Sequence, residues 1–528
     1  MKKFFLNHPI EILFSILFLT LAAVLNLQFL EGANINHSIA GHDEYLTVRE
    51  VYSILNPLSW KHFVLAIIGG DILYYGRVMF YTDALFAYVP FKIWGLDGMV
   101  YAIRMTHSVW ILISFLILNN LFIKTKLNQF LFLFGSAGVM YSIYFVQMPK
   151  PEPLQLFFIA MFLRGLFKNN YKFGSYYFWL GLALAIKINV LLLLPLMFLL
   201  PLIIHKSSGF KANLQSGFKG LMWFLIGFFV GIPCLLLTPI QPVYLKTYLH
   251  ETVFGTTKFY DDSNLGFIKW LESGLGDNYL GSHLLAYVFV LLAFALTIYT
   301  AFNYLKNKDK KGLQIVVISA MGLILMLSVM VLTKRLWPHY LWTGFVLIWL
   351  SFIIFSEVSV NRHYKKISVV LLIVFFGVST FTFYIKVLPI KINRYNSKEM
   401  LITRAESAQL YQYLESNFKN KEIGIDGSVF YPYRHFIHSS PYHPFASERP
   451  KTATIIFKLY ADQPDLIWEC DVVVFKDRYP PLLNSSKNTL KAEDVNKFNS
   501  IFEMQTNNNF VLDTMIGENR IFKRTKDN

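Results

Sequence analysis

Two adjacent carboxylates beside a histidine follow the first long apolar run of the chain. His42, Asp43 and Glu44 lie in a polar loop that begins near residue 31. Such a group near a membrane surface can bind a divalent cation or remove a proton from a substrate. The same acids can instead cap a helix that starts near Glu44, because Asp is a good N-cap residue. Their spacing alone leaves both readings open.

Glu152 and Lys187 are charged residues at the borders of other apolar runs. Glu152 lies in MPKPEP, at the entrance to such a run, and Lys187 lies among leucines in LALAIKINVLLLLP. A carboxylate at that depth is costly unless it is paired, which makes Glu152 a candidate functional residue. A salt bridge with Lys150, or a favourable position at a helix N-terminus, is the alternative. Lys187 either extends to lipid headgroups or holds an anion.

The segment TKRLWPHYL combines cationic and aromatic residues between two apolar runs. Lys334 and Arg335 are candidate phosphate ligands, because the planar guanidinium fork donates two hydrogen bonds. Trp337 and Tyr340 also suit an aromatic anchor at the membrane interface. His339 is a candidate metal ligand, although a lone histidine more often makes ordinary hydrogen bonds.

Four weaker candidates complete the predicted site. They are polar residues near the stronger ones or in a later polar loop, where an ordinary solvated role is the alternative. We assign them as further substrate contacts: His42, Lys150, Tyr260 and Asp261.

Composition indicates that lipid is the solvent for much of the chain. Of 528 residues, 55% are hydrophobic and only 16% are charged, whereas a soluble domain carries about 25% charged residues. The net charge of +16 comes from short basic clusters between apolar runs, as expected for cytoplasmic loops and not for a nucleic-acid-binding surface. Two cysteines, Cys234 and Cys470, predict neither a disulfide nor a metal-binding cysteine cluster.

About eleven apolar runs are long enough to span a bilayer. The first reads as an uncleaved span and not as a signal peptide, because it is long and no small-residue cleavage site follows it. The predicted spans are residues 10–30, 100–121, 130–146, 153–168, 173–187, 188–205, 218–238, 284–305, 313–332, 340–357 and 366–388. The stretch 172–205 can also be one helix and a re-entrant piece.

The stretch 76–95 decides the topology. It is apolar enough to be a span, yet it contains Arg77, Asp83, Pro90 and Lys92. If it crosses the membrane, nearly all basic loops lie outside; if it lies in the interface, they all face the cytoplasm. The positive-inside rule therefore favours an amphipathic helix in the plane of the membrane.

This topology places the candidate residues and the chain's last part on the same outer face. From about residue 390 the composition becomes that of a soluble domain, with short strands expected at 423–431, 470–475 and 509–515 and a helix at 405–418. The predicted fold is an α-helical polytopic membrane protein with in-plane helices in its first outer loop. We expect residues 1–389 to form the transmembrane domain and 390–528 a small α/β extracytoplasmic domain.

The order of these features resembles the GT-C class of glycosyltransferases that use polyprenyl-phosphate sugars, such as aminoarabinose lipid A transferases and protein O-mannosyltransferases. Four segments carry the resemblance: residues 41–51 (GHDEYLTVREV), 74–95, 146–158 (VQMPKPEPLQLFF) and 181–195 (GLALAIKINVLLLLP). The resemblance covers most of the membrane half and lies in order and spacing more than in identity.

The resemblance implies roles for particular residues. Asp43 looks like the base that activates the acceptor hydroxyl, with Glu44 assisting it or helping to hold a metal. Glu152 matches a second outer-loop acid, although Asp is commoner there in the class. Lys187 and Arg335, together with Lys334, look like lipid-phosphate ligands.

The chemistry implied by the resemblance is inverting transfer of a sugar from a polyprenyl-phosphate donor to a lipid, glycan or protein acceptor in the cell envelope. A phosphate is already a good leaving group, so the reaction needs cationic stabilisation of phosphate and a base for the hydroxyl. A divalent metal ion, held by Asp43 and His339, would also stabilise the phosphate. The resemblance implies a cell inner membrane location, with a cytoplasmic N-terminus and a periplasmic C-terminal domain.

Two other functional classes remain open from the sequence. A multi-pass transporter or lipid flippase would place polar residues and broken helices near the midplane, often in two related halves. A non-catalytic envelope scaffold would use the outer domain to bind a partner. The sequence determines neither the sugar nor the acceptor.

Overall fold

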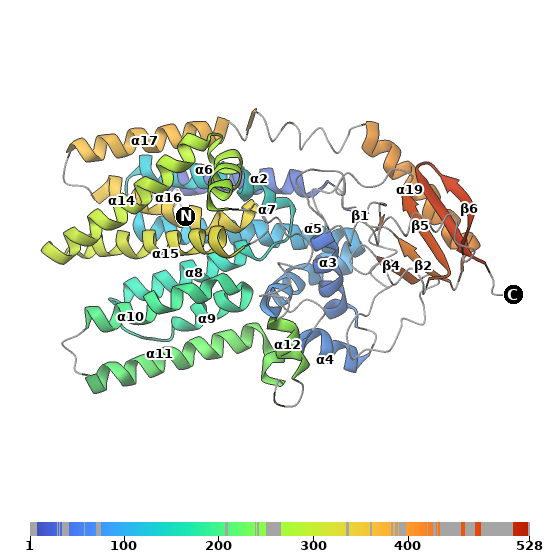
Figure 1. Ribbon diagram of the computed structural model, residues 1–528, viewed down its shortest axis with the longest axis horizontal. Coiled ribbons are helices and arrows are strands. Elements are labelled where there is room, and N and C mark those ends of the chain that lie inside the picture. The colour runs from blue at the N-terminus through green and yellow to red at the C-terminus, as the bar shows by residue number, and fades with distance from the viewer. Residues whose placement is uncertain are drawn as a thin grey trace.

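The structure of the protein is a computed structural model. It describes residues 8–28, 30, 32–33, 42–57, 59–69, 75–205, 210–237, 239, 242–249, 266–333, 337–358, 362–381, 384–385, 389, 398–419, 421–425, 429, 431–432, 456–459, 470–476 and 510–525. Figure 1 shows a body of roughly aligned helices with a small sheet beyond one end.

The helical body contains most of the chain. Its first half comprises α2 (Pro9–Asn26), α3 (His42–Leu55), α4 (Trp60–Ile68), α5 (Arg77–Phe122), α6 (Lys126–Ala137), α7 (Met140–Gln147), α8 (Glu152–Lys168) and α9 (Tyr177–Ile186). Its second half comprises η1 (Ile188–Leu193), α10 (Leu194–Ile204), α11 (Phe210–Gly231), η3 (Pro233–Leu237), α12 (Val243–Leu249), α13 (Phe267–Lys269), the π-helix η5 (Trp270–Leu280), α14 (His283–Asn307), α15 (Lys310–Leu332), η6 (Pro338–Leu341), α16 (Trp342–Val358) and α17 (Arg362–Phe381).

Several of these helices are long and apolar enough to cross a membrane. Within the described residues there are five: Pro9–Asn26, Arg77–Phe122, His283–Asn307, Lys310–Val331 and Pro338–Val358. The bent pair Lys126–Ala137 and Tyr141–Gln147, with 58° between its axes, would make a sixth. The chain is therefore a multi-pass membrane protein, while the count of eleven spans stays a prediction.

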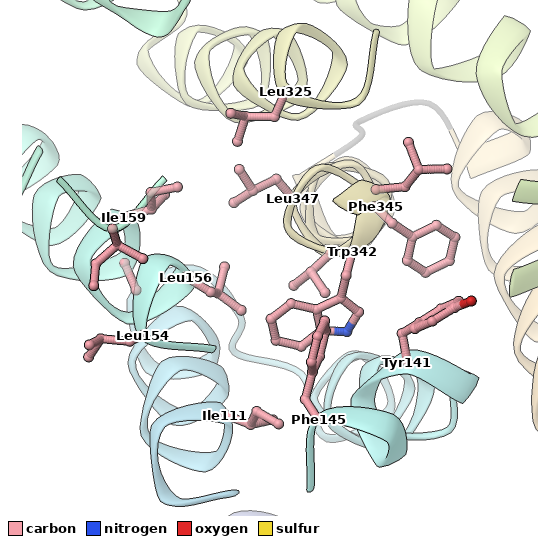
Figure 2. Close-up of a cluster of buried hydrophobic side chains, with 14 of the residues drawn as sticks. Ile111, Tyr141, Phe145, Leu154, Leu156, Ile159, Leu325, Trp342, Phe345 and Leu347 are labelled. Atoms are coloured by element: carbon pink, nitrogen blue, oxygen red, sulfur yellow. The ribbon is translucent and has the colours of Figure 1, made fainter. Parts of the chain in front are cut away.

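Large side chains fill the space between the central helices. Trp342 of α16 lies at the centre of this core, with its ring centroid 5.0 Å from that of Phe145 on α7 (Figure 2). Its indole N–H donates to the Ser142 hydroxyl at 2.8 Å. A buried indole needs such an acceptor, so this bond fixes α16 against α7.

Helix-end contacts define two opposite ends of the body. At one end, which we call the site end, the Gln147 amide donates to the Leu25 carbonyl at 3.3 Å. At the other, the basic end, the Glu357 carboxylate accepts the backbone N–H of Lys124 at 2.8 Å. The His205 ring bonds to the Asn170 carbonyl at 2.8 Å, which joins the end of α10 to the turn before α9. The basic clusters Lys124/Lys126, Arg164/Lys168/Lys172 and Lys306/Lys308/Lys310/Lys311 thus lie at or near helix ends on the basic side.

The segment 76–95 does not carry the chain across the body. Gly95 has a φ of 64° and breaks α5 into two helices. The imidazole of His107 lies 3.2 Å from the carboxylate of Asp83, so the first helix lies against the second. Arg104 of the second helix bonds to the Asn26 carbonyl at the site end. Gly95 precedes Arg104 on that helix and therefore lies beyond it at the site end. That 76–95 lies in the plane of the membrane stays a prediction.

A five-stranded sheet forms the C-terminal domain. Its strand order is β4 (Ile456–Leu459), β2 (Glu422–Ile425), β5 (Val472–Lys476), β7 (Asn519–Arg524), β6 (Phe510–Ile516). The first three strands are parallel, β7 is antiparallel to its neighbours, and α19 (Lys398–Asn417) packs on β6. The predicted helix and the strands at β2, β5 and β6 are present; β4 and β7 were missed.

The loop between α2 and α5, which the sequence predicts to be the first outer loop, is tied to this domain. Strand β1 (Gly32–Ala33) pairs antiparallel with β3 (Tyr431–Pro432). Figure 1 places α3 and α4 at the end of the helical body nearest the sheet. The loop that contains Asp43 and the C-terminal domain therefore share one side of the molecule.

Candidate functional site

Lys187 and Glu152 form an ion pair at the site end. The Lys187 ammonium bonds to Glu152 Oε1, and the two side chains are 14% and 1% exposed. Glu152 is the first residue of α8, where a carboxylate is also stabilised by the helix dipole. The sequence offered Lys150 as the partner of Glu152 and an external anion as the partner of Lys187; in the fold the two candidates bind each other.

The chain positions Lys187 by breaking a helix. Residue 187 has extended backbone (φ −156°, ψ 126°) between α9 and the 3₁₀ helix η1. Gln155, one turn into α8, donates to the Asn189 side chain at 2.8 Å and accepts from Thr343 at 3.2 Å. These bonds satisfy polar groups beside the break, which lipid would not do. The stretch 172–205 is thus a discontinuous hairpin with Lys187 at its tip.

A glycine allows the first outer loop to approach this tip. Gly76 has a φ of 64°, and a Cβ there would lie 2.6 Å from the Ala185 carbonyl oxygen. Only glycine fits both the backbone angle and the close approach. The contact places Tyr75 beside Lys150, whose ammonium lies 3.4 Å from the tyrosine hydroxyl.

Aromatic rings surround the two lysines. Lys187 Nζ lies 3.5 Å from the centroid of the Tyr340 ring, and Lys150 Nζ lies 5.7 Å from that of Trp337. His339 stacks on Trp337 with centroids 5.7 Å apart. Such rings attract cations through their quadrupoles and exclude water. The sequence interpreted these aromatics as interfacial anchors; in the fold they form the wall of the site.

Two buried lysines lie close together in this cluster. Lys150 is 1% exposed and interacts electrostatically with Lys187, so both ammonium groups lie near the Glu152 carboxylate. Buried ammonium groups of this kind are a functional-site hypothesis in a membrane protein. Among the described residues Glu152 Oε2 has no hydrogen-bond partner, which leaves a buried acceptor next to the cations for a donor group of a ligand.

Glu44 has a partner of its own. Its carboxylate receives two hydrogen bonds from Arg104, from Nε at 2.5 Å and from Nη2 at 3.1 Å. Both side chains are buried. This bidentate pair fastens α3 to α5 and favours a positioning role for Glu44. Helix α3 begins at His42, so Asp43 lies in its first turn and is not the N-cap.

Several predicted residues fall outside the described residues. They are Lys334, Arg335, Tyr260 and Asp261, and the side chains of His42 and Asp43. The chain segment of Lys334 and Arg335 adjoins Trp337, so the predicted phosphate ligands are close in sequence to the described cluster.

The described part of the site does not favour a metal ion at His339. No group of three or more His, Cys, Asp or Glu side chains in the described part of the chain is placed to hold one. His339 is buried and interacts electrostatically with Lys150 and Lys187, and two ammonium groups repel a cation. The metal ion proposed from the sequence stays a prediction.

Sequence reasoning missed two buried charged pairs. Arg77 bonds to Glu50 at 2.5 Å, and Asp83 lies beside His107. Charged residues inside the apolar run 76–95 were the available signal, because each needs a partner there. Their partners lie 27 and 24 residues away, a separation that gives no local pattern.

The helices and the buried site define a multi-pass membrane protein with a cationic, aromatic-lined site at one end. No protein-family model and no curated protein matches the chain. Its fold is similar to that of ArnT from Cupriavidus metallidurans in the apo state, at 10% identity over 97% of both chains and a TM-score of 0.50. ArnT bound to undecaprenyl phosphate matches over 98% of both chains, at 9% identity and a TM-score of 0.49. The resemblance to the GT-C class is thus confirmed for the fold.

Proposed function

We propose that this protein is an inverting glycosyltransferase that moves a sugar from a polyprenyl-phosphate donor to an acceptor in the cell envelope. The observation that carries this proposal is the cluster of Lys150, Lys187 and Glu152 under the rings of Trp337 and Tyr340. It supplies buried cations for a phosphate at the tip of a broken helix in the membrane body. The ArnT fold, known with undecaprenyl phosphate in ArnT itself, supports the same chemistry.

Each residue has a proposed task in this reaction. Lys150 and Lys187, with Arg335 and Lys334 from the adjoining segment, stabilise the phosphate as its bond to the sugar breaks. Glu152 orients Lys187 and accepts a hydrogen bond from the sugar. Asp43 removes the proton of the acceptor hydroxyl. The hydroxyl oxygen bonds to the anomeric carbon from the face opposite the leaving phosphate, so the configuration inverts.

The test is transfer of radiolabelled sugar from a native lipid extract to envelope material in membranes with the protein. Wild type should transfer label, and Asp43→Asn should lose about 10²–10⁴-fold as expected for loss of a general base. Lys150→Met should lose transfer because phosphate stabilisation weakens. Lys421→Met, an exposed lysine of the sheet domain, is the matched control and should keep wild-type activity.

The outcomes separate the competing functions. Transfer by wild type and by Asp43→Asn alike would keep the enzyme and remove Asp43 from its centre. No transfer by wild type, across extracts labelled in several sugars, would favour a transporter or lipid flippase.

A further inference from the structure

An apolar groove lies between α14, α16 and α17, away from the candidate site. Its volume is about 330 Å³, at the lower limit of the roughly 300–1,000 Å³ of small-molecule sites. Figure 1 shows these three helices side by side in the body. The walls are almost entirely hydrocarbon and include Leu292, Leu296, Phe352, Phe355, Leu372 and Phe375. A groove with this lining, between helices that span the membrane, suits an acyl chain.

Two hydroxyl-bearing residues lie in the part of the groove towards the basic end, among apolar ones. Tyr299 on α14 and Ser368 on α17 line that part of it. Helix α14 ends at the basic end and α17 begins there, so the next residues along both helices approach the membrane surface. The groove therefore has hydrocarbon walls along its length, with two hydroxyl groups in the part nearer the surface.

Two lysines lie further along the helix faces that line the groove, towards the basic end. Lys306 follows Tyr299 by seven residues, and Lys365 precedes Leu372 by seven. Seven residues are about two helical turns, so each lysine lies on the face of its helix that lines the groove. Both side chains are exposed. They are placed to reach a headgroup whose acyl chain lies in the groove.

The surrounding charge is positive. Lys308, Lys310, Lys311 and Lys366 are exposed nearby in sequence. The one acid in this loop, Asp309, already accepts the backbone N–H groups of Lys311 and Gly312 at 3.0 Å and caps α15. Clusters of lysine beside a membrane helix attract anionic lipid headgroups.

We propose that this groove is a binding site for one anionic glycerophospholipid from the leaflet at the basic end. One acyl chain lies along Leu292, Phe352 and Phe375, and Lys306 and Lys365 bind the phosphate. The site is separate from the cluster around Lys187, which lies at the opposite end of the helical body. The proposal stands whether or not the protein transfers a sugar.

Native mass spectrometry of the full-length protein in detergent tests this, with phosphatidylglycerol and phosphatidylcholine of identical acyl chains as probes. Wild type should retain one phosphatidylglycerol more tightly than phosphatidylcholine. Each lysine should contribute about fivefold, which is about 1 kcal/mol. Lys306→Gln with Lys365→Gln should therefore weaken phosphatidylglycerol binding about 25-fold and leave phosphatidylcholine unchanged. The control pair Lys172→Gln with Lys219→Gln, exposed lysines near α9 and on α11, should change neither.

A second variant tests the acyl-chain part without disturbing the core. Ala295 lies on the exposed rim of the groove, so Ala295→Trp should fill it and weaken binding of both lipids at an unchanged melting temperature. Leu291→Trp is the control, because Leu291 is 67% exposed and outside the groove lining. Equal binding of the two lipids by wild type, or an unchanged affinity in the Lys306/Lys365 variant, would overturn the proposal. Displacement of phosphatidylglycerol by one equivalent of undecaprenyl phosphate would assign the groove to the donor lipid instead.

Discussion

Lys187 lies between a carboxylate and an aromatic ring, and this position accounts for a lysine inside a leucine-rich segment. The ammonium bonds to Glu152 and lies 3.5 Å from the Tyr340 ring centroid. Each partner offsets part of the cost of removing the charge from water. Lys150 lies near enough to interact electrostatically with Lys187, and we assign both lysines to phosphate binding.

Removing one member of this pair should cost more than removing both. Lys187→Met leaves the Glu152 carboxylate buried without its cation, so we expect the protein to lose about 3–5 kcal/mol of stability. Lys187→Met with Glu152→Gln should recover most of that loss but not phosphate-dependent transfer. Thermal unfolding of the purified variants in detergent, followed by tryptophan fluorescence, measures the difference. A double variant as unstable as Lys187→Met would contradict the pairing.

The ring of Tyr340 should matter through its face and not through its hydroxyl. Tyr340→Phe keeps the aromatic face towards Lys187, so donor affinity should stay within about twofold of wild type. Tyr340→Leu removes a cation–π contact that is worth up to about 2 kcal/mol when desolvated, and donor affinity should fall about tenfold or more. Transfer rates at graded donor concentrations give both values; equal losses in the two variants would argue against the cation–π role.

At the scale of elements, two irregular segments build the site. Helix α9 ends at Lys187, and the chain turns at Gly76. The π-helix η5 supports η6 from the side, where the Tyr279 hydroxyl donates to the Pro338 carbonyl at 2.8 Å. The end of α9 exposes Lys187 to the Tyr340 ring, and the turn at Gly76 brings Tyr75 to Lys150.

The two glycines with positive φ should respond differently to the same substitution. Gly76→Ala and Gly95→Ala both place a Cβ on a backbone with a φ of 64° and a ψ outside the left-handed helical region, which costs about 1–3 kcal/mol. A Cβ at Gly95 meets nothing within 4 Å, whereas one at Gly76 lies 2.6 Å from the Ala185 carbonyl oxygen. We therefore expect Gly76→Ala to lower both the melting temperature and sugar transfer, and Gly95→Ala to cost only the backbone strain. Similar losses at both sites would show that the close approach to Ala185 is unimportant.

The C-terminal domain should weaken at acid pH through Asp513. This carboxylate accepts a hydrogen bond from the Lys523 ammonium at 2.7 Å and another from the Tyr413 hydroxyl at 2.5 Å. These hydrogen bonds lower the pKa of Asp513, below its unfolded value of about 3.9. Its stabilising effect is therefore complete well above pH 4 and is lost as the pH falls through the folded-state pKa.

Hydrogen exchange of β6 and β7 in the full-length protein measures this, after correction for the intrinsic pH dependence of exchange. In the wild-type protein, the corrected exchange of β6 and β7 should be faster at pH 2.5 than at pH 5. In Asp513→Asn most of that difference should disappear. An unchanged pH dependence in the variant would assign the acid sensitivity to another group.

At the scale of the whole molecule, the lysine-rich loops and the candidate site lie at opposite ends of the helical body. The lysine-rich loops follow helix ends at the basic end, while the Lys187 cluster, the first outer loop and the sheet domain share the other. The β1–β3 pairing joins that loop to the sheet domain. The positive-inside rule then predicts that the basic end is cytoplasmic and the sheet domain extracytoplasmic.

Cysteine labelling in intact cells tests this orientation. Both native cysteines are buried, so they should react slowly with a membrane-impermeant maleimide. Glu518→Cys, in the exposed turn between β6 and β7, should be labelled without permeabilising the inner membrane, and Lys310→Cys, in the exposed loop at the basic end, only after lysis. The reverse pattern would invert the topology.

The sequence by itself determined the membrane class and the gathering of basic loops at one end, and it predicts that segment 76–95 does not cross the membrane. These follow from local hydropathy and from the sidedness of charge, which are properties of short segments. It also located Glu152, Lys187 and the Trp337–Tyr340 segment as separate candidates.

Only the tertiary structure decided which candidates meet. Lys187 pairs with Glu152, 35 residues away, and Glu44 with Arg104, 60 residues away. Hydropathy and spacing do not encode such pairings, because they depend on which helix faces pack together and where helices break. Folding turns Lys187 from an isolated lysine into part of a buried cationic site, and it turns Glu44 from a candidate acid into the partner of a buried arginine.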